Sequence, residues 1–505
     1  MAFLLRQSVR VGTRRLLPAL YATRGFSAGV VAPSQAQRTA SNPQLNFPCL
    51  DVNQDRERSL DGGPEPAYEK IATGYKTFSH KQPFLLDHGG VLPSFEIAYE
   101  TWGQLNKAKD NVILIHTGLS GSSHAKSHPD NTSKGWWEDF IGPGLYIDTN
   151  KFFVICTNVI GGCYGSTGPS SVDPADGERY ATRFPILTIF DMVRAQFFLL
   201  DHLGVDRLHA SVGSSMGGMQ SIAAASLFPQ RVNRVISISG CARSHPYSIA
   251  LRHTQRSVLM NDPNWNKGFY YKGHPPHLAR EIATITYRSG PEWEQRFGRK
   301  RAHEDQSPAL CPDFLIETYL DHQGERFCLQ YDANSLLYVS KAMDLFDMSA
   351  SARQKLQGQR DRNKVRFAKL LQDQGEVEAC KIASPVSSLE PHAVENNKEN
   401  LQEDVRSHLK TVADRPALSS LPNTPDLQDL VAGMRNITMP SLVIGVQSDI
   451  LFPVWQQKEI AECLRLGGNK NVTYYELDSM YGHDTFLIDK VGIGSAIKGH
   501  LELLE

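Results

Sequence analysis

Short apolar runs alternate with helical patterns in two parts of the chain, which lie on either side of a more polar middle. Runs rich in β-branched and aromatic residues predict buried strands at residues 84–86, 95–99, 111–115, 152–159, 208–212, 235–239, 441–446 and 472–477. Apolar residues at helical spacing predict helices over 189–203 and 217–228, the first with Asp191 near its start. Strands that alternate with helices indicate an α/β fold with a mostly parallel central sheet.

The folded part of the chain is expected to begin near Tyr75, at the start of the first strand pattern. A turn at residues 87–90, Asp-His-Gly-Gly, separates the runs at 84–86 and 95–99. This arrangement is typical of a hairpin, so these two strands are expected to pair with each other.

The polar middle of the chain predicts two different insertions between core segments at 75–240 and 435–505. Over 241–349 aromatic residues, histidines and helical patterns replace the strand–helix alternation, which predicts a helical cap over the mouth of the sheet. Residues 350–430 are charged, rich in Gln, Asn and Ser, and almost without aromatics. Such a composition buries too little apolar surface to order itself, so a largely disordered insertion with some helix near 356–371 is expected.

A basic cluster lies in the helical part of that insertion. We expect a solvated helix face there rather than an RNA site. Its members are Arg360, Arg362, Lys364, Arg366 and Lys369.

Residues 1–50 do not have the pattern of a folded segment. Arginines recur among Leu, Val, Ala and Ser, and no acidic residue precedes Asp51. An Arg-rich, acid-poor start is the signature of a mitochondrial transit peptide, and 24–28 resembles a cleavage site for a matrix protease. The sequence therefore predicts a disordered leader and a location in the mitochondrial matrix.

The composition of the chain argues against several classes of partner and of site. The chain has 505 residues, 41% of them hydrophobic, and a formal net charge of -1, which gives no general attraction to nucleic acid or to membranes. No apolar run approaches the roughly 18–20 residues that cross a bilayer. The eight cysteines form no C-x-x-C pair, which argues against a disulfide framework or a zinc site and suits a reducing compartment. No metal and no bound cofactor are expected.

The strongest chemical signal lies at residues 213–217, Gly-Ser-Ser-Met-Gly, which match G-x-S-x-G. A predicted strand precedes the motif and a predicted helix follows it, which is the context of a nucleophile elbow. Ser215 is the candidate nucleophile, and the backbone N–H of Met216 would face an oxyanion at the helix N-terminus. Ser214 lies off the central position and is assigned to packing or hydrogen bonding.

Three further positions complete this constellation. The glycine-rich turn after the strand at 111–115 is where such a fold recruits a second oxyanion donor, and the N–H of Leu119 is the candidate. Asp449 follows one late strand and His483 follows the next. The chain order Ser, Asp, His, with each residue at the end of a strand, predicts a triad in which Asp449 orients His483 and His483 deprotonates Ser215.

These residues, together with several longer blocks, resemble the homoserine/serine O-acyltransferase family of the α/β-hydrolase fold. The resemblance covers about 75–350 and 435–500. Within the family the chain looks most like the fungal mitochondrial serine O-acetyltransferase branch, and both Ser214 in place of the usual glycine and the 350–430 insertion point the same way. The blocks that carry the resemblance lie at 135–137, 142–144, 153–169, 191–196 and 481–484.

The resemblance implies a ping-pong acyl transfer in which acetyl-CoA, or succinyl-CoA, acylates Ser215 and the hydroxyl of L-serine then takes the acyl group, in cysteine biosynthesis. It also implies that Arg280 and Asp484 bind the acceptor, as an arginine fork suits a carboxylate and a carboxylate suits an ammonium group. Arg288 and Arg256 are alternatives for the carboxylate. Relatives in this family are commonly dimers, so a homodimer is expected.

Several alternatives stay open from the residues alone. Serine and homoserine differ by one methylene, which a pocket distinguishes by only about 1–3 kcal/mol. Homoserine O-acetyl transfer in methionine biosynthesis and serine O-succinyl transfer are therefore both possible activities. An esterase is disfavoured because water needs no recognition of a zwitterion, and a non-catalytic binding protein is disfavoured by the complete triad.

Overall fold

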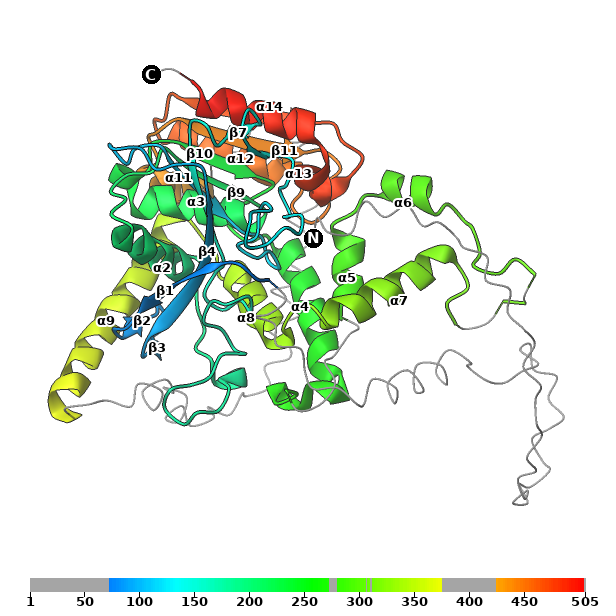
Figure 1. Ribbon diagram of the computed structural model, residues 1–505, viewed down its shortest axis with the longest axis horizontal. Coiled ribbons are helices and arrows are strands. Elements are labelled where there is room, and N and C mark those ends of the chain that lie inside the picture. Colours follow the sequence, from blue (N-terminus) through cyan, green and yellow to red (C-terminus); the bar gives the residue numbers. More distant parts are fainter. Residues whose placement is uncertain (1–71, 272–278, 306, 309–310, 375–423, 504–505) are drawn as a thin grey trace.

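The computed structural model describes residues 72–271, 279–305, 307–308, 311–374 and 424–503 (Figure 1). Its centre is an eight-stranded sheet. The strands, in spatial order, are β1 (Lys76–His80), β4 (Phe95–Trp102), β8 (Phe153–Thr157), β5 (Val112–His116), β9 (Ala210–Ser214), β10 (Val235–Ile238), β11 (Ser441–Val446) and β12 (Val472–Leu477). Strand β4 runs antiparallel to β1 and β8, and all other neighbours are parallel, which confirms the mostly parallel sheet.

Helices cover both faces of this sheet. The alternation along β5 shows why two cores form: Val112 and Leu114 enter one hydrophobic cluster, whereas Ile113 and Ile115 enter the other. The first cluster includes residues of α8 (Ala333–Asp344) and of four further helices, and the second includes those of α14 (Lys490–Leu501). The four further helices are α2 (Ile189–His202), α3 (Met216–Leu227), α11 (Pro425–Met434) and α12 (Val454–Leu466).

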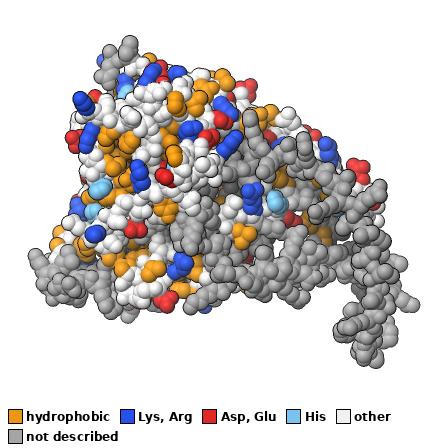
Figure 2. Space-filling view, viewed as in Figure 1, with side chains coloured by type: hydrophobic (Ala, Val, Ile, Leu, Met, Phe, Trp, Pro, Cys, Tyr) orange, Lys and Arg blue, Asp and Glu red, His pale blue; other side chains and the backbone are white. Residues whose placement is uncertain are grey.

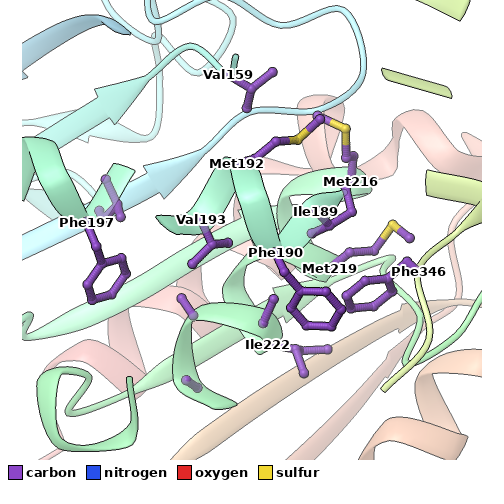
Figure 3. Close-up of a cluster of buried hydrophobic side chains, with 14 of the residues drawn as sticks. Val159, Ile189, Phe190, Met192, Val193, Phe197, Met216, Met219, Ile222 and Phe346 are labelled. Atoms are coloured by element: carbon purple, nitrogen blue, oxygen red, sulfur yellow. The ribbon is translucent and has the colours of Figure 1, made fainter. Parts of the chain in front are cut away.

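The first core is dense where α2 meets α3 (Figure 3). Met192 and Met219 lie between these helices, and the ring of Phe190 packs against that of Phe346 with centroids 5.5 Å apart. Full burial of each such side chain stabilises the fold by about 1.5–3 kcal/mol. This packing fixes α3, and therefore the turn that precedes it, against the sheet.

The N-terminal hairpin differs from the one predicted. Strand β2 (Phe84–Leu85) pairs with β3 (Val91–Leu92) across the turn at 87–90, whereas β4 pairs with β1 and β8. The expected pairing of 84–86 with 95–99 is therefore wrong. A second short strand, 91–92, was too brief to produce a pattern of its own.

Residues 241–349 contribute no strand to the sheet among the described residues, and form helices that lie below and to the right of it in Figure 1. These are α4 (Pro246–Asn261), α5 (Ala279–Thr286), α6 (Gly290–Arg296), α7 (Leu315–Cys328) and α8 (Ala333–Asp344). The same region contains a 3-10 turn at Pro263–Gly268. Shorter elements elsewhere are β6 (Ile141–Gly142), β7 (Ile147–Asp148), α13 (Thr485–Ile488) and the 3-10 turns at Ala181–Arg183, Pro229–Arg231 and Gly482–Asp484.

Helix α9 (Ala350–Gln374) is longer than the helix expected in the polar insertion, and it is attached to the core. Arg360 Nη1 lies 3.0 Å from Asp87 Oδ1 and 3.4 Å from Asp191 Oδ1, and Arg194 Nη1 lies 2.6 Å from the same Asp87 oxygen. Burial and the neighbouring Asp87 carboxylate raise the pKa of Asp191 to about 7, so the two arginines compensate a buried acidic pair.

The prediction of a wholly solvated basic face is therefore wrong at Arg360. The helix expected near 356–371 is present and spans 350–374. Residues 425–430, at the end of that segment, belong to helix α11. Residues 375–423 lie outside the described residues, as do 1–71 with the predicted leader.

The surface charges and the cysteines agree only in part with what the composition predicts. Basic and acidic side chains are interspersed on the face shown in Figure 2. Among the described residues no helix is both long and apolar enough to cross a bilayer. Four described cysteines are free and buried, but Cys311 is disulfide-bonded, which departs from the expectation of no disulfides.

Candidate active site

The predicted elbow is a sharp turn between β9 and α3. Strand β9 runs to Ser214 rather than ending at 212, and Ser215 follows with φ 58° and ψ -126°, a strained conformation for a residue with a side chain. The flanking glycines are required by space. A Cβ at Gly213 would lie 2.0 Å from the carbonyl oxygen of Gly217, and one at Gly217 would lie 2.2 Å from that of His116.

The structure brings the three predicted triad residues into one hydrogen-bonded chain. His483 Nε2 lies 2.8 Å from Ser215 Oγ, and His483 Nδ1 lies 2.6 Å from Asp449 Oδ2. The other Asp449 oxygen accepts from the backbone N–H groups of Leu451 and Phe452, at 2.9 and 2.8 Å. Asp449 is thereby fixed in position, and it fixes the orientation of the imidazole in turn.

A pocket of about 90 Å³ opens at Ser215 and His483. Its apolar walls come from the sheet loops and the cap, and include Leu119, Trp136, Met343, Leu451 and Phe486. The cap helices also contribute polar residues, Arg252 and Gln255 from α4 and Thr286 from α5. A nucleophile at the base of a mostly apolar pocket is shielded from water, which strengthens the polar interactions made inside it.

Both predicted oxyanion donors lie beside the nucleophile. Met216 is the first residue of α3, so its N–H has no partner within the helix. Leu119 lines the pocket, and a Cβ placed on the preceding Gly118 would lie 4.0 Å from the Cβ of Ser215. Tyr331 Oη donates to the Leu119 carbonyl at 2.8 Å, which ties this loop to the cap.

Ser214 is buried against the pocket, and among the described residues its Oγ has no hydrogen-bond partner. Of the two roles that the sequence left for it, packing rather than hydrogen bonding is the one observed. The hydroxyl that engages the imidazole is that of Ser215.

The two predicted acceptor-binding residues differ in what the structure describes. Arg280 belongs to α5, but its side chain lies outside the described part. Asp484 is buried, and its Oδ2 lies 3.5 Å from Arg288 Nη2. Burial alone would lower the pKa of Arg288, but the carboxylates of Asp484 and Glu292 outweigh it and raise that pKa, so this arginine is held as a cation.

The third arginine considered for the acceptor carboxylate, Arg256, is engaged elsewhere. Its Nη2 contacts the carboxylate of Asp344, and its Nη1 lies 3.2 Å from Ser340 Oγ. It is not among the described residues that line the pocket. Arg252, one helical turn earlier, does line the pocket and was not among the predicted residues. The i, i+4 spacing of these two arginines places both on one face of α4, a signal that the sequence does contain.

One further cluster, which sequence reasoning missed, joins Glu100 on β4 to two histidines of the loop that continues from Leu119. Glu100 Oε2 is 2.8 Å from His124 Nδ1 and 2.7 Å from His128 Nε2, and Ser123 Oγ donates to Glu100 Oε1 at 2.9 Å. Among the described residues this is a group whose ligand atoms lie within 4.8 Å of one another and could hold a metal ion. Its present distances are those of hydrogen bonds, and the group anchors the loop that continues from Leu119.

Comparison with known proteins shows which family and which relatives this chain resembles. The model for the alpha/beta hydrolase fold family matches residues 111–490. A serine O-succinyltransferase of Emericella nidulans is 58% identical over 489 residues, covering 94% of this chain and 91% of the relative. A homoserine O-acetyltransferase of Moorella thermoacetica is 37% identical over 425 residues, covering 83% and 93%. The crystal structure of homoserine O-acetyltransferase from Bacillus anthracis superposes with a TM-score of 0.64 at 24% identity, covering 85% of this chain and 98% of that one.

Proposed function

This chain belongs to the α/β-hydrolase fold family, in its homoserine/serine O-acyltransferase branch, and we propose that it transfers the succinyl group of succinyl-CoA to the hydroxyl of L-serine. Serine as acceptor is the expectation from the sequence. Succinyl-CoA, an alternative there, now comes before acetyl-CoA because the relative that is 58% identical is named for succinyl transfer. The acceptor and the donor are the parts of the proposal that kinetics must decide.

In the first half-reaction, His483 removes the proton of Ser215 Oγ as this oxygen attacks the thioester carbonyl. The negative charge that develops on the carbonyl oxygen would be stabilised by the N–H groups of Met216 and Leu119. The tetrahedral intermediate collapses with loss of CoA thiolate, which takes a proton from the imidazolium, and succinyl-Ser215 remains. Asp449 stays ionised throughout and stabilises the imidazolium.

In the second half-reaction, His483 deprotonates the hydroxyl of L-serine, whose oxygen attacks the succinyl ester. Collapse of the second tetrahedral intermediate returns the proton to Ser215 and releases O-succinylserine. We assign Arg280 to the carboxylate of the amino acid and Asp484 to its ammonium group, which would place a zwitterion rather than water at the acyl-enzyme. This assignment separates the proposal from an esterase.

The observation that carries this mechanism is the unbroken chain from Asp449 through His483 to Ser215, with Ser215 and His483 in the lining of a mostly apolar pocket. The test is a matrix of kcat/KM values for succinyl-CoA and acetyl-CoA, each with L-serine and L-homoserine. We expect the highest value for succinyl-CoA with L-serine, and a succinyl mass on the peptide that contains Ser215 when serine is omitted. A preference for acetyl-CoA would refute the donor, and a preference for homoserine would refute the acceptor.

We also propose that the protein acts in the mitochondrial matrix and that its product enters cysteine biosynthesis. The support for the location is the Arg-rich, acid-poor stretch at 1–50, a pattern that import receptors and matrix proteases act on. Fusion of 1–50 to a fluorescent protein should direct it to mitochondria, and replacement of Arg6, Arg10 and Arg14 by Gln should prevent this. Diffuse fluorescence of the unaltered fusion would contradict the proposed location.

A further inference from the structure

We propose that a cleft between helix α9 and the core binds a small carboxylate with an apolar body, at a site separate from the pocket that contains Ser215. The cleft has a volume of about 310 Å³, and residues of α2, α3, α9 and α11 line it. None of the described residues that line this cleft also lines the pocket at Ser215. The inference therefore goes beyond the proposed acyl transfer and does not depend on it.

Arg353, on α9, is a cation of this cleft that lacks a carboxylate partner. Its Nη1 donates to the backbone carbonyl of Gly433, and within the described part of the chain its guanidinium makes no other hydrogen bond and no ion pair. The neighbouring Arg194, which also lines the cleft, contacts both Asp87 and Asp191. An anion that enters the cleft would therefore meet a guanidinium whose charge the protein itself does not compensate.

The pKa of Arg353 reflects the same imbalance. Burial, and then the positive charge of Arg194, lower this pKa. Arg243 and Arg288 are also partly removed from water, but carboxylates in contact with them raise their pKa values. Without such a partner the charged form of Arg353 costs free energy, and a carboxylate bound beside it would lower that cost.

The walls of the cleft indicate the chemical class of the ligand. Phe190, Leu227 and Leu356 provide apolar surface, which suits the methylenes or the ring of an organic acid. The same walls would remove water from a phosphate without replacing its hydrogen bonds. A planar guanidinium matches the two oxygens of a carboxylate, and Gln357 adds an amide donor to the lining.

A ligand in this cleft would connect α9 to the core. Arg353 and Leu356 belong to α9, whereas Phe190 belongs to α2, beside which α9 runs in Figure 1, and to the buried cluster of Figure 3. Arg360, two helical turns after Arg353, already attaches α9 to Asp87. The ligand would add a second attachment on the same helix, so binding should raise the melting temperature of the protein.

The test is isothermal titration calorimetry of the full chain with hexanoate as the probe. We expect one site per chain in the wild type. Arg353→Gln should weaken the binding by about 10- to 100-fold, because a charge-assisted hydrogen bond is lost. Hexanamide, which has the same apolar body without the charge, should bind the wild type more weakly by a similar factor. Inorganic phosphate, which has charge without an apolar body, should not displace hexanoate.

Arg362→Gln is the matched control, because it removes the same charge from an exposed position of the same helix that is not part of the described cleft lining. It should leave the affinity for hexanoate within about threefold of the wild type. Ala432→Phe places a ring in the cleft from an exposed position on α11 and should abolish binding although Arg353 is kept. This variant carries the test if Arg353→Gln does not fold.

Four outcomes would overturn the inference. The wild type might bind no hexanoate, or Arg353→Gln bind it with unchanged affinity, which would place the molecule elsewhere, as in the pocket at Ser215. Equal affinities for hexanoate and hexanamide would show that no charge is recognised. Displacement of hexanoate by phosphate would refute the requirement for an apolar body. These measurements involve no acyl-CoA, so their failure is distinguishable from a failure of the proposed donor or acceptor.

Discussion

Two buried histidine–carboxylate pairs, one in the predicted triad and one in the cluster around Glu100, differ in the partner of the second ring nitrogen of the histidine. In one pair His483 Nδ1 lies 2.6 Å from Asp449, and in the other His124 Nδ1 lies 2.8 Å from Glu100. The second ring nitrogen distinguishes them. His483 Nε2 faces the hydroxyl of Ser215 at 2.8 Å, whereas His124 Nε2 faces the carbonyl oxygen of Ser133 at 2.9 Å.

The third partner therefore decides what each pair can do. A hydroxyl can donate, so a neutral His483 with its proton on Nδ1 is fully satisfied and keeps a basic Nε2 toward Ser215. A carbonyl only accepts, so His124 satisfies both of its neighbours only as the imidazolium. Burial alone would lower the pKa of His124, but its hydrogen bonds to Glu100 and to the Ser133 carbonyl raise it. The same pair serves as a base in one place and as a structural cation in the other.

Of the substitutions that test this comparison, removal of the Ser215 hydroxyl should have the largest effect on turnover. Ser215→Ala is expected to lower kcat by about 10⁶-fold, because triad residues act as a unit. Steady-state turnover with succinyl-CoA and L-serine measures it. Ser214→Ala, which removes a neighbouring hydroxyl that has no hydrogen-bond partner in the described structure, should keep most of the activity. A similar loss in both variants would contradict the assignment of the nucleophile.

Asp449→Asn should have the next largest effect. An amide that donates toward Nδ1 imposes the wrong tautomer on His483, and kcat should fall by about 10⁴-fold while the fold is retained. The pH dependence of kcat/KM in the same variant separates a lost orientation from a lost fold. Near-normal turnover would mean that the imidazole of His483 is held by other contacts.

Glu100→Ala tests the structural pair. It removes the acceptor of His124, His128 and Ser123 together, and breaking a buried charged pair in this way should lower the free energy of unfolding by about 3–5 kcal/mol. Urea unfolding measures this loss. Glu96→Ala, at an exposed position on the same strand, should change stability by no more than about 0.5 kcal/mol. An equal decrease in the free energy of unfolding in the two variants would show that the buried cluster does not stabilise the fold more than an exposed glutamate does.

The smallest effect concerns the protonation of His124. Because its pKa in the folded state is raised above 6.5, its contribution to stability is complete below about pH 6.5 and is lost as the pH rises through the folded pKa. The stability difference between the wild type and His124→Gln should therefore shrink from pH 6 to pH 9. Ser123→Ala, which removes a hydrogen bond without a titrating group, should differ from the wild type by a constant amount. A constant difference for His124→Gln as well would argue against the imidazolium.

The catalytic pair was predictable from the sequence, whereas the structural pair was not. Ser215, Asp449 and His483 each follow an apolar strand pattern, and parallel strands of one sheet bring such positions to a common edge. Glu100 lies within a strand, and His124 and His128 lie in a loop without a repeating pattern. Their meeting depends on how that loop folds back, which local patterns do not encode.

The same limit explains the other departures. The composition of the insertion predicted a helix near 356–371 with a solvated basic face, but one side chain of that face, Arg360, reaches a buried acidic pair in the core and holds the helix there. Arg252 lines the pocket only because α4 packs over the sheet, and only tertiary contacts decide that. The pairing of β2 with β3 followed from a strand of two residues, too short to be distinguished from a loop.

The strained backbone at Ser215 has a consequence for the evolution of this fold. A non-glycine residue at φ 58° and ψ -126° carries a cost of about 1–3 kcal/mol, which a glycine there would not. Selection for thermal robustness alone would therefore favour loss of the serine, and a lineage released from its chemistry should drift to glycine at this position. A serine that is kept at this position in spite of the backbone strain therefore indicates selection for catalysis.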